Sequence, residues 1–211
     1  MADYRRLKIP GATYFFTVVT FMRKPIFSEE ISREILRNAI DETNKLLPFQ
    51  LDAWVLLPDH LHCLWTLPEG DRDFSKRWGI IKSHFTKKIK EVGWALPTMT
   101  NRDQVGWALP TMTNPDRIEL TLRAQDQVMP SRVKHREGMI WQRRFWEHAI
   151  RDQEDFNRHC DYIHYNPVKH GLADDPKKWK YSTIHQFIER GVYAPNWGDS
   201  VGEEILSMDF E

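Results

Sequence analysis

The most constraining feature of the sequence is a pair of apolar, strand-like runs that only two residues separate. The first run, Leu51–Leu57, ends at Pro58, and the second, His60–Leu67, begins directly after Asp59 and ends at Pro68-Glu69-Gly70. Proline, aspartate and glycine are typical of turns, and strands joined by so short a connection pair antiparallel. The sequence therefore predicts a β-hairpin over 51–67 within an antiparallel sheet.

Helical and strand-like segments alternate on both sides of this hairpin. A strand is predicted over 13–20, a helix from Ser28, its expected N-cap, to Lys45, and a basic amphipathic helix over 73–90. A strand over 144–151 and a helix from Asp152 to about Tyr165 follow, with Asn166-Pro167 expected to end the helix. A weaker helical pattern covers 182–190. The order βαββαβ with further helices predicts an α+β, ferredoxin-like fold, with an antiparallel sheet and helices on one face.

A tandem repeat interrupts this pattern. VGWALPTMTNRDQ at 92–104 is followed at once by VGWALPTMTNPDR at 105–117. Two copies cannot build a solenoid, and their Gly, Pro, Thr and Asn suit neither helix nor strand. We expect a flexible, repeat-bearing insertion at about 91–139 within a single domain over 1–195, with an acidic tail over 196–211. A functional lid is the alternative reading of the insertion.

Composition and charge limit the class of protein. Hydrophobic residues make up 41% of the 211 residues, which is enough for a packed core, and no apolar run is long enough to cross a membrane. Cys63 and Cys160 are expected to be buried thiols rather than a disulfide, which indicates a cytoplasmic protein. The net charge is zero, yet 74–90 carries six basic residues and no acid, whereas 196–211 carries five acids and no base. The tail could fold over the basic surface and restrain activity.

Two short motifs could together form a metal-dependent site. His60 and His62 lie two apart on a predicted strand, so both imidazoles can face one cation while Leu61 faces the core. Tyr162 and Asn166 lie four apart on one face of a predicted helix. An Asn oxygen is a suitable third ligand, and the open positions suit Mg²⁺ or Mn²⁺. Taken singly, either motif also arises as ordinary strand or core sequence.

Around these motifs the chain resembles the REP-associated tyrosine transposases, relatives of single-tyrosine HUH transposases. The matching stretches are DYRR at 3–6, TYFFTV at 13–18, AWVLLPDHLHCLWTLPEGDRDFSKRW at 53–78, WQRRFWEHAIRD at 141–152, DYIHYNPVKHGL at 161–172 and WKYSTIHQFIERGVY at 179–193. The resemblance implies that His60 and His62 are the HUH ligands, Asn166 the third ligand and Tyr162 the nucleophile on a C-terminal helix. Tyr165 is expected to be a packing residue.

The resemblance also implies a substrate and a reaction. The expected substrate is single-stranded DNA next to a REP or similar palindromic hairpin, cleaved through a 5′-phosphotyrosine link that a 3′-OH can reverse. The expected phosphate contacts are Arg5, Arg6, Lys82, Lys87, Lys88, Arg143, Arg144 and Arg151. Trp78, Trp141 and Trp146 are candidates for stacking on unpaired bases. We expect a monomer or homodimer that is cytoplasmic and nucleoid-associated, with no membrane contact.

Three other functions remain open on the sequence alone. A ferredoxin-like sheet can serve as a non-catalytic nucleic-acid-binding module, although the predicted sheet face carries His60 and His62 rather than exposed aromatics. An HxH hydrolase or phosphodiesterase would use histidine as its acid and base and would not need Tyr162. A rolling-circle replication initiator would share the tyrosine chemistry.

Overall fold

Across residues 6–92, 140–198, 205 and 207–208, which the computed structural model describes, the protein forms a four-stranded sheet and four helices. Within the same residues, three short 3-10 turns connect these elements, namely Phe21–Arg23, Ile26–Ser28 and Pro176–Lys178. The strands are β1 (Thr13–Val19), β2 (Gln50–Leu56), β3 (His60–Thr66) and β4 (Trp146–Ala149), and the helices are α1 (Glu30–Leu46), α2 (Phe74–Glu91), α5 (Gln153–Lys169) and α6 (Ile184–Glu189). The tandem repeat, apart from Val92, lies outside the described residues, as does most of the predicted insertion.

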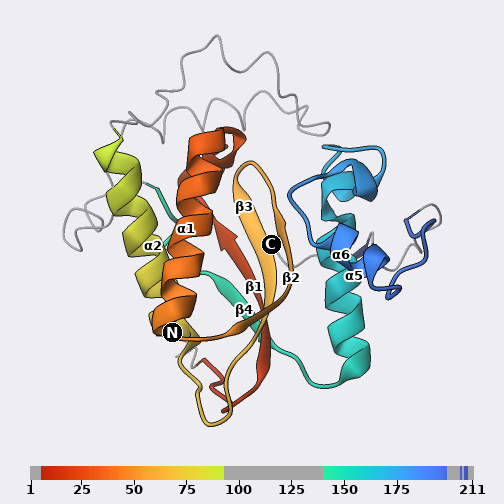
Figure 1. Cartoon of the computed structure of the whole chain (residues 1–211), viewed down its shortest axis with the longest axis horizontal. Coiled ribbons are helices and arrows are strands. Elements are labelled where there is room, and N and C mark those ends of the chain that lie inside the picture. The colour runs from red at the N-terminus through yellow and green to blue at the C-terminus, as the bar shows by residue number, and fades with distance from the viewer. Residues whose placement is uncertain (1–5, 93–139, 199–204, 206, 209–211) are drawn as a thin grey trace, which may run out of the picture.

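All strand pairs in the sheet are antiparallel, in the order β2-β3-β1-β4 (Figure 1). The predicted hairpin forms as expected, with Leu56 opposite Leu61 and the Leu57 amide donating to the His60 carbonyl. This order, with α1 and α2 as the crossing helices, confirms the α+β, ferredoxin-like prediction.

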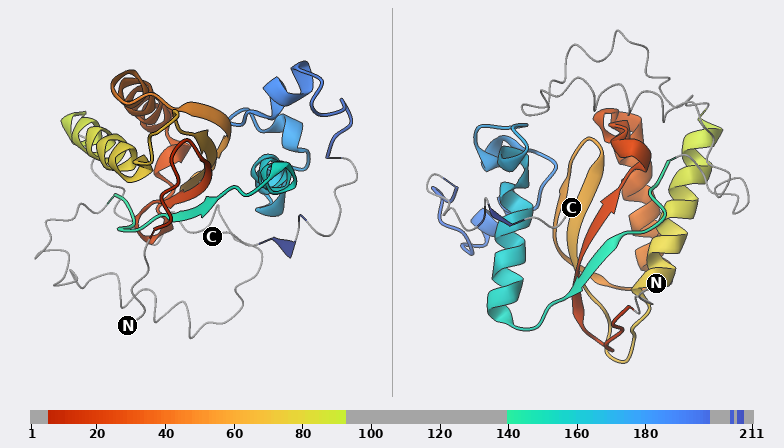
Figure 2. Two further views of the ribbon diagram at one scale, coloured as in Figure 1. Left: turned by 90° about the horizontal axis from the view of Figure 1, so that it is seen from below. Right: turned by 180° about the vertical axis from the view of Figure 1, so that it is seen from behind.

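Helices cover both faces of the sheet, which explains why almost every residue of β1 and β3 is buried. Helices α1 and α2 cover one face, and α5 lies on the other side (Figure 2). On the α1–α2 side, Tyr14, Phe16 and Leu61 pack with the predicted apolar stripe of α2, namely Phe74, Trp78, Ile81, Phe85 and Ile89. On the α5 side, Phe15 and Leu64 pack against Cys160, Tyr162 and Ile163. Burial of this apolar surface holds the three layers together.

The bounds of α5 correct one prediction. The helix does not end at Tyr165 but continues through Pro167 to Lys169. Pro167 lies in the last turn, where it removes only one helical hydrogen bond, and the carbonyls of Asn166 and Pro167 accept from His170 and Leu172. Asn166 is therefore helical and sits one turn beyond Tyr162.

The start of α1 corrects a second prediction. Ser28 is not the N-cap, because it belongs to a 3-10 turn over Ile26–Ser28, and Glu29 occupies the cap position without a side-chain hydrogen bond. The guanidinium of Arg33 binds the carbonyls of Phe27 and Ser28 instead, which fixes the entry to the helix.

Within the part of the chain that the structure describes, no helix is both long and apolar enough to span a membrane.

Candidate functional site

His60 and His62 lie side by side on the face of β3 that α5 covers. Both are buried, with 1% and 0% of their surfaces exposed, and their ring centroids are 4.8 Å apart. Leu61 between them packs into the opposite core, as the strand alternation predicts. The structure therefore brings the two imidazoles together on one face of the sheet.

Each of these histidines is oriented through its Nδ1 atom. His60 Nδ1 donates to Asp59 Oδ1 at 2.6 Å, and His62 Nδ1 shares a hydrogen bond of 2.9 Å with Thr17 Oγ1. Burial raises the pKa of Asp59, but the bond from His60 and the nearby charge of Arg23 outweigh it and hold that pKa below its ordinary value. Metal-binding histidines commonly have such a partner on the other ring nitrogen. Nε2 is then the nitrogen that each ring could give to a cation.

Helix α5 presents Tyr162 and Asn166 to the same place. The Tyr162 ring meets the His62 ring edge to face, with ring centroids 5.2 Å apart. Two turns further along the chain, the ring centroid of His170 lies 5.2 Å from that of His60. Asn166 lies between these two contacts along the helix. The structure thus brings together all four residues that the sequence predicted for the catalytic and metal roles.

The Asn166 side chain is the most unusual group in this cluster. It is completely buried, and neither Oδ1 nor Nδ2 has a hydrogen-bond partner among the described residues. A buried amide atom without a partner costs about 1–3 kcal/mol of stability, so proteins rarely keep one without a functional reason. The donor set of two imidazoles and one amide oxygen fits a divalent cation with open positions.

Four further residues belong to the site, and the sequence analysis gave none of them a role. Thr17 and Asp59 orient the histidines, His170 contacts His60, and the Lys169 ammonium lies 5.0 Å from the centre of the Tyr162 ring. Lys169 also donates to the backbone carbonyl of Met208. The signal for Lys169 was its spacing: it follows Tyr162 by seven residues, which is two helical turns on the same face.

A second cluster of histidines and a carboxylate lies beside the first, between β4 and the start of α5. Ligand atoms of His148, Asp155 and His159 all lie within 4.8 Å of one another, so this group could also hold a metal ion. His148 and Arg151 donate to Asp155 Oδ2 at 2.8 and 3.1 Å. Although burial raises the pKa of Asp155, these bonds hold it well below its ordinary value. Burial lowers the pKa of His159.

Most of the predicted phosphate contacts lie away from the sheet face that carries His60 and His62 and that α5 covers, which we call the histidine face. Arg6 pairs with Glu147 on the α1–α2 side, and Lys87 and Lys88 pair with Glu91 at the end of α2. Lys82 on α2 donates to the Gln142 carbonyl, and burial, followed by the charge of Arg6, lowers its pKa to about 8. Arg151 lies on the histidine face, and Arg143 and Arg144 are exposed just before β4. Arg5 is outside the described residues.

The three tryptophans predicted to stack on bases differ in their exposure to solvent. Trp78 is 1% exposed and Trp141 is 8% exposed, and both are core residues. Trp146, at the start of β4, is 40% exposed. Tyr165 is half-buried near Trp197, which agrees with its predicted packing position.

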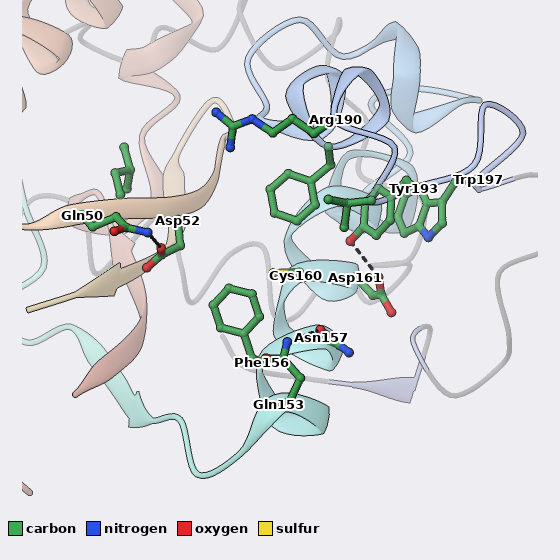
Figure 3. Close-up of a pocket in the computed structure, with 13 residues that line it drawn as sticks. Gln50, Asp52, Gln153, Phe156, Asn157, Cys160, Asp161, Arg190, Tyr193 and Trp197 are labelled. Atoms are coloured by element: carbon green, nitrogen blue, oxygen red, sulfur yellow. Dashed lines mark hydrogen bonds between the residues drawn. The ribbon is translucent and has the colours of Figure 1, made fainter. Parts of the chain in front are cut away.

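A pocket of about 670 Å³ opens between β2, α5 and the segment after α6 (Figure 3). Its lining includes Asp52, Asp161 and Arg190 but none of the four residues of the predicted site. Tyr193 donates to Asp161 across one side at 2.7 Å. Burial raises the pKa of the Asp52 and Asp161 carboxyls. Two acidic groups in the lining do not favour the binding of a phosphate in this pocket.

Comparison with known proteins gives clear relatives, although no protein-family model matches the chain. The chain is 38% identical to the REP-associated tyrosine transposase of Escherichia coli K12, over 98% of this chain and all of that protein. It is 36% identical to a putative REP-associated tyrosine transposase of Haemophilus influenzae Rd, over 94% of each.

A solved structure agrees with these relatives. A REP-associated tyrosine transposase bound to a REP hairpin has a TM-score of 0.67 and 36% identity, covering 96% of this chain and 94% of that one. Identity at this level over nearly the whole length, together with a shared fold, shows common descent of the whole described architecture. The chain belongs to the REP-associated tyrosine transposases.

Proposed function

We propose that this protein is a metal-dependent, single-stranded DNA endonuclease and strand transferase that acts on REP-like palindromic hairpins through a 5′-phosphotyrosine intermediate. The observation that carries the proposal is the fully buried, unsatisfied amide of Asn166, one helical turn from Tyr162 and between the contacts that α5 makes with His62 and His60. A site built around a phosphate and a cation gives that amide its partner and places a tyrosine hydroxyl within the same enclosure.

In this proposal His60, His62 and Asn166 hold a divalent ion, Mg²⁺ or Mn²⁺. Nε2 of each histidine and Oδ1 of Asn166 are the donor atoms, and Asp59 and Thr17 fix the two rings through Nδ1. When bound, the ion polarises and orients the scissile phosphate as a Lewis acid. The His148, Asp155 and His159 group is the competing site, but its carboxylate already accepts from His148 and Arg151.

Tyr162 is the proposed nucleophile. Its phenol oxygen forms a bond to phosphorus, the bond from phosphorus to the 3′ oxygen breaks, and that oxygen leaves as a 3′-OH with a proton. A free phenol has a pKa of about 10, so attack at neutral pH requires help with proton loss. The Lys169 ammonium, 5.0 Å from the ring centre, adds a positive charge beside the attacking side chain. Attack by a 3′-OH on the phosphotyrosine reverses the step and joins two strands.

The proposed DNA substrate is inferred from the relative whose solved structure contains a REP hairpin. An attacking side chain must reach an exposed backbone phosphate, which favours a single-stranded segment beside the hairpin. Arg151, on the histidine face, and the exposed Arg144 are the best placed phosphate contacts. We further propose that residues 1–195 act as one domain, as a monomer or homodimer in the bacterial nucleoid.

The proposal is tested by incubating the protein with a REP hairpin oligonucleotide that carries a single-stranded 5′ flank, in Mn²⁺ or Mg²⁺. We expect a covalent protein–DNA adduct that EDTA and Tyr162→Phe each abolish. Tyr165→Phe is the matched control, because Tyr165 lies on the same helix but points toward Trp197. An adduct that persists in Tyr162→Phe would contradict the assignment of the nucleophile. Hairpin binding without any adduct would instead support a non-catalytic DNA-binding protein.

A further inference from the structure

We propose that Trp146, backed by His148, is a stacking platform for an unpaired DNA base next to the scissile phosphate. This inference rests on the proposed function, because it assumes that single-stranded DNA reaches the histidine face. It adds a binding subsite, formed by the edge strand β4, to a site whose predicted ligands and nucleophile lie on β3 and α5.

The sheet register places Trp146 beside the predicted cation site. Thr17 on β1 pairs with His62 on one side and with Trp146 on the other, so the three residues form one row across the sheet. Residues paired across neighbouring strands point to the same face, and strands lie about 4.8 Å apart. Trp146 is therefore two strands, or about 10 Å, from His62 on the same face. That separation suits a base whose own or neighbouring phosphate lies at the histidines.

The indole is held in place by neighbouring rings on the same face of the sheet. Its plane is within 8° of the His148 ring, with centroids 6.0 Å apart, and His148 is in turn within 13° of the His159 ring at 4.8 Å. Phe15 meets the indole edge to face at 5.6 Å. Asp155 fixes His148 through a hydrogen bond of 2.8 Å. These contacts preorganise the ring, so little side-chain freedom is lost when a base stacks on it.

Exposure distinguishes Trp146 from the other tryptophans considered for this role. Trp78 and Trp141 are buried in the core between the sheet and α2, whereas 40% of Trp146 is exposed at the edge of the sheet. A large aromatic side chain left partly in water on the functional face is a common feature of nucleic-acid sites, because every base has a flat apolar surface to stack on it.

The charge around Trp146 favours a nucleotide over an apolar protein segment. Arg143 and Arg144 are exposed three and two residues before Trp146, and the Arg151 side chain pairs with Asp155, which also accepts from His148. A base on the indole would bring its phosphates among these guanidinium groups, and phosphate contacts with arginine fix the path of a strand. In this subsite the exposed arginines would contact the phosphates of the strand, and the exposed indole would contact the base.

The test measures equilibrium binding in a Tyr162→Phe background, so that no DNA is cleaved. The probe is a REP hairpin oligonucleotide with a single-stranded 5′ flank and one 2-aminopurine, moved through each flank position in turn. We expect the fluorescence to be quenched at one or two positions and restored by Trp146→Ala. We also expect Trp146→Ala to weaken binding about 5- to 150-fold and Trp146→Phe by no more than about threefold. A hairpin without the flank should bind both variants equally.

Ile31→Ala is the matched control, because Ile31 has the same exposed fraction of 40% but lies on α1, across the sheet. Equal affinities of Trp146→Ala and Ile31→Ala for the flanked hairpin would overturn the proposal, and so would an equal loss with the unflanked hairpin. These results are independent of catalysis. If the wild-type protein forms its adduct and the Trp146 variants show no effect on binding or quenching, only the stacking subsite is refuted.

Discussion

The rings of Tyr162 and His62 meet edge to face, 5.2 Å apart, across the contact between α5 and β3. This places the predicted nucleophile against a predicted ligand, although the two come from distant parts of the sequence. Both side chains are at most 1% exposed in the described structure. In so enclosed a position, small changes in the residues that hold either ring should alter chemistry more than stability.

Thr17→Val tests whether the hydrogen bonds behind the histidines tune metal binding. The substitution keeps the side-chain shape but removes the hydroxyl that lies 2.9 Å from His62 Nδ1. We expect affinity for Mn²⁺ to fall about 10- to 100-fold, as for other partners of metal-binding histidines, while DNA affinity in EDTA stays the same. Calorimetric titration with Mn²⁺ provides the measurement. Thr13→Val, which removes a hydroxyl bonded to Thr66 at the far end of β1, should leave the Mn²⁺ affinity unchanged.

Asn166→Leu should separate stability from function. Because the buried amide has no hydrogen-bond partner in the described structure, replacing it with an apolar side chain of similar size removes a desolvation cost. We expect the metal-free protein to gain about 1–2 kcal/mol in the free energy of unfolding, measured by urea denaturation, and to lose its stabilisation by Mn²⁺. Asn157→Leu, at an exposed position on the same helix, should change neither quantity appreciably. A loss of stability in metal-free Asn166→Leu would show that the amide is satisfied after all.

His164 should make the stability of the protein depend on pH. Its ring bonds to Tyr193 and Thr183, and burial, with a smaller effect of His185, lowers its pKa from 6.5 to about 3. Below pH 6.5 the unfolded chain therefore binds a proton that the folded chain does not. This group should lower the free energy of unfolding by about 1.4 kcal/mol for each pH unit below 6.5.

Urea denaturation at pH 7, 6 and 5 measures this slope. In His164→Gln the slope should decrease by that amount, whereas His185→Gln, at an exposed site, should keep most of it. Burial raises the pKa of the neighbouring Asp161, which favours the folded state as pH falls toward that pKa and opposes the effect of His164, so each variant is compared with wild type at the same pH. Identical slopes in wild type and His164→Gln would rule out the depressed pKa.

The two histidine groups should differ in their affinity for a cation. We expect His62→Ala to abolish tight Mn²⁺ binding, measured by electron paramagnetic resonance, and His148→Ala to keep it within about threefold. The reason is that the Asp155 carboxylate already accepts from His148 and Arg151, and a guanidinium beside it repels a second cation. Retention of tight binding in His62→Ala, with loss in His148→Ala, would assign the ion to the other group.

Much of the fold could be predicted because it depends on local pattern. The hairpin at Pro58-Asp59, the apolar stripe of α2 and the alternation around Leu61 are all set by spacing of two or about 3.6 residues. The two incorrect helix ends, at Ser28 and Tyr165, depend on the guanidinium of Arg33, five residues after Ser28, and on where a proline falls within the last turn. Neither can be read from a local preference for caps or breakers.

The candidate site, too, could be predicted only in the part that depends on local spacing. Spacing placed His60 with His62 and Tyr162 with Asn166, but it could not show that the two pairs meet. The sheet register adds Thr17 and places Trp146, one of three candidate tryptophans, in the same row as His62, because it aligns β1 and β4 with that residue. The basic residues of α2 show the same limit, because a charged stretch indicates that a surface is solvated but not which side of the sheet it faces.

The division of the predicted ligands between β3 and α5 has a mechanical consequence. A cation held by His60, His62 and Asn166 would tie the helix to the sheet, much as a covalent cross-link closes a long loop. Any strain that draws α5 away from β3 would then weaken cation binding and displace Tyr162 in the same movement. Loading of the ion and positioning of the nucleophile would become one thermodynamically linked event, so the helix could not carry an activated tyrosine while detached from its metal.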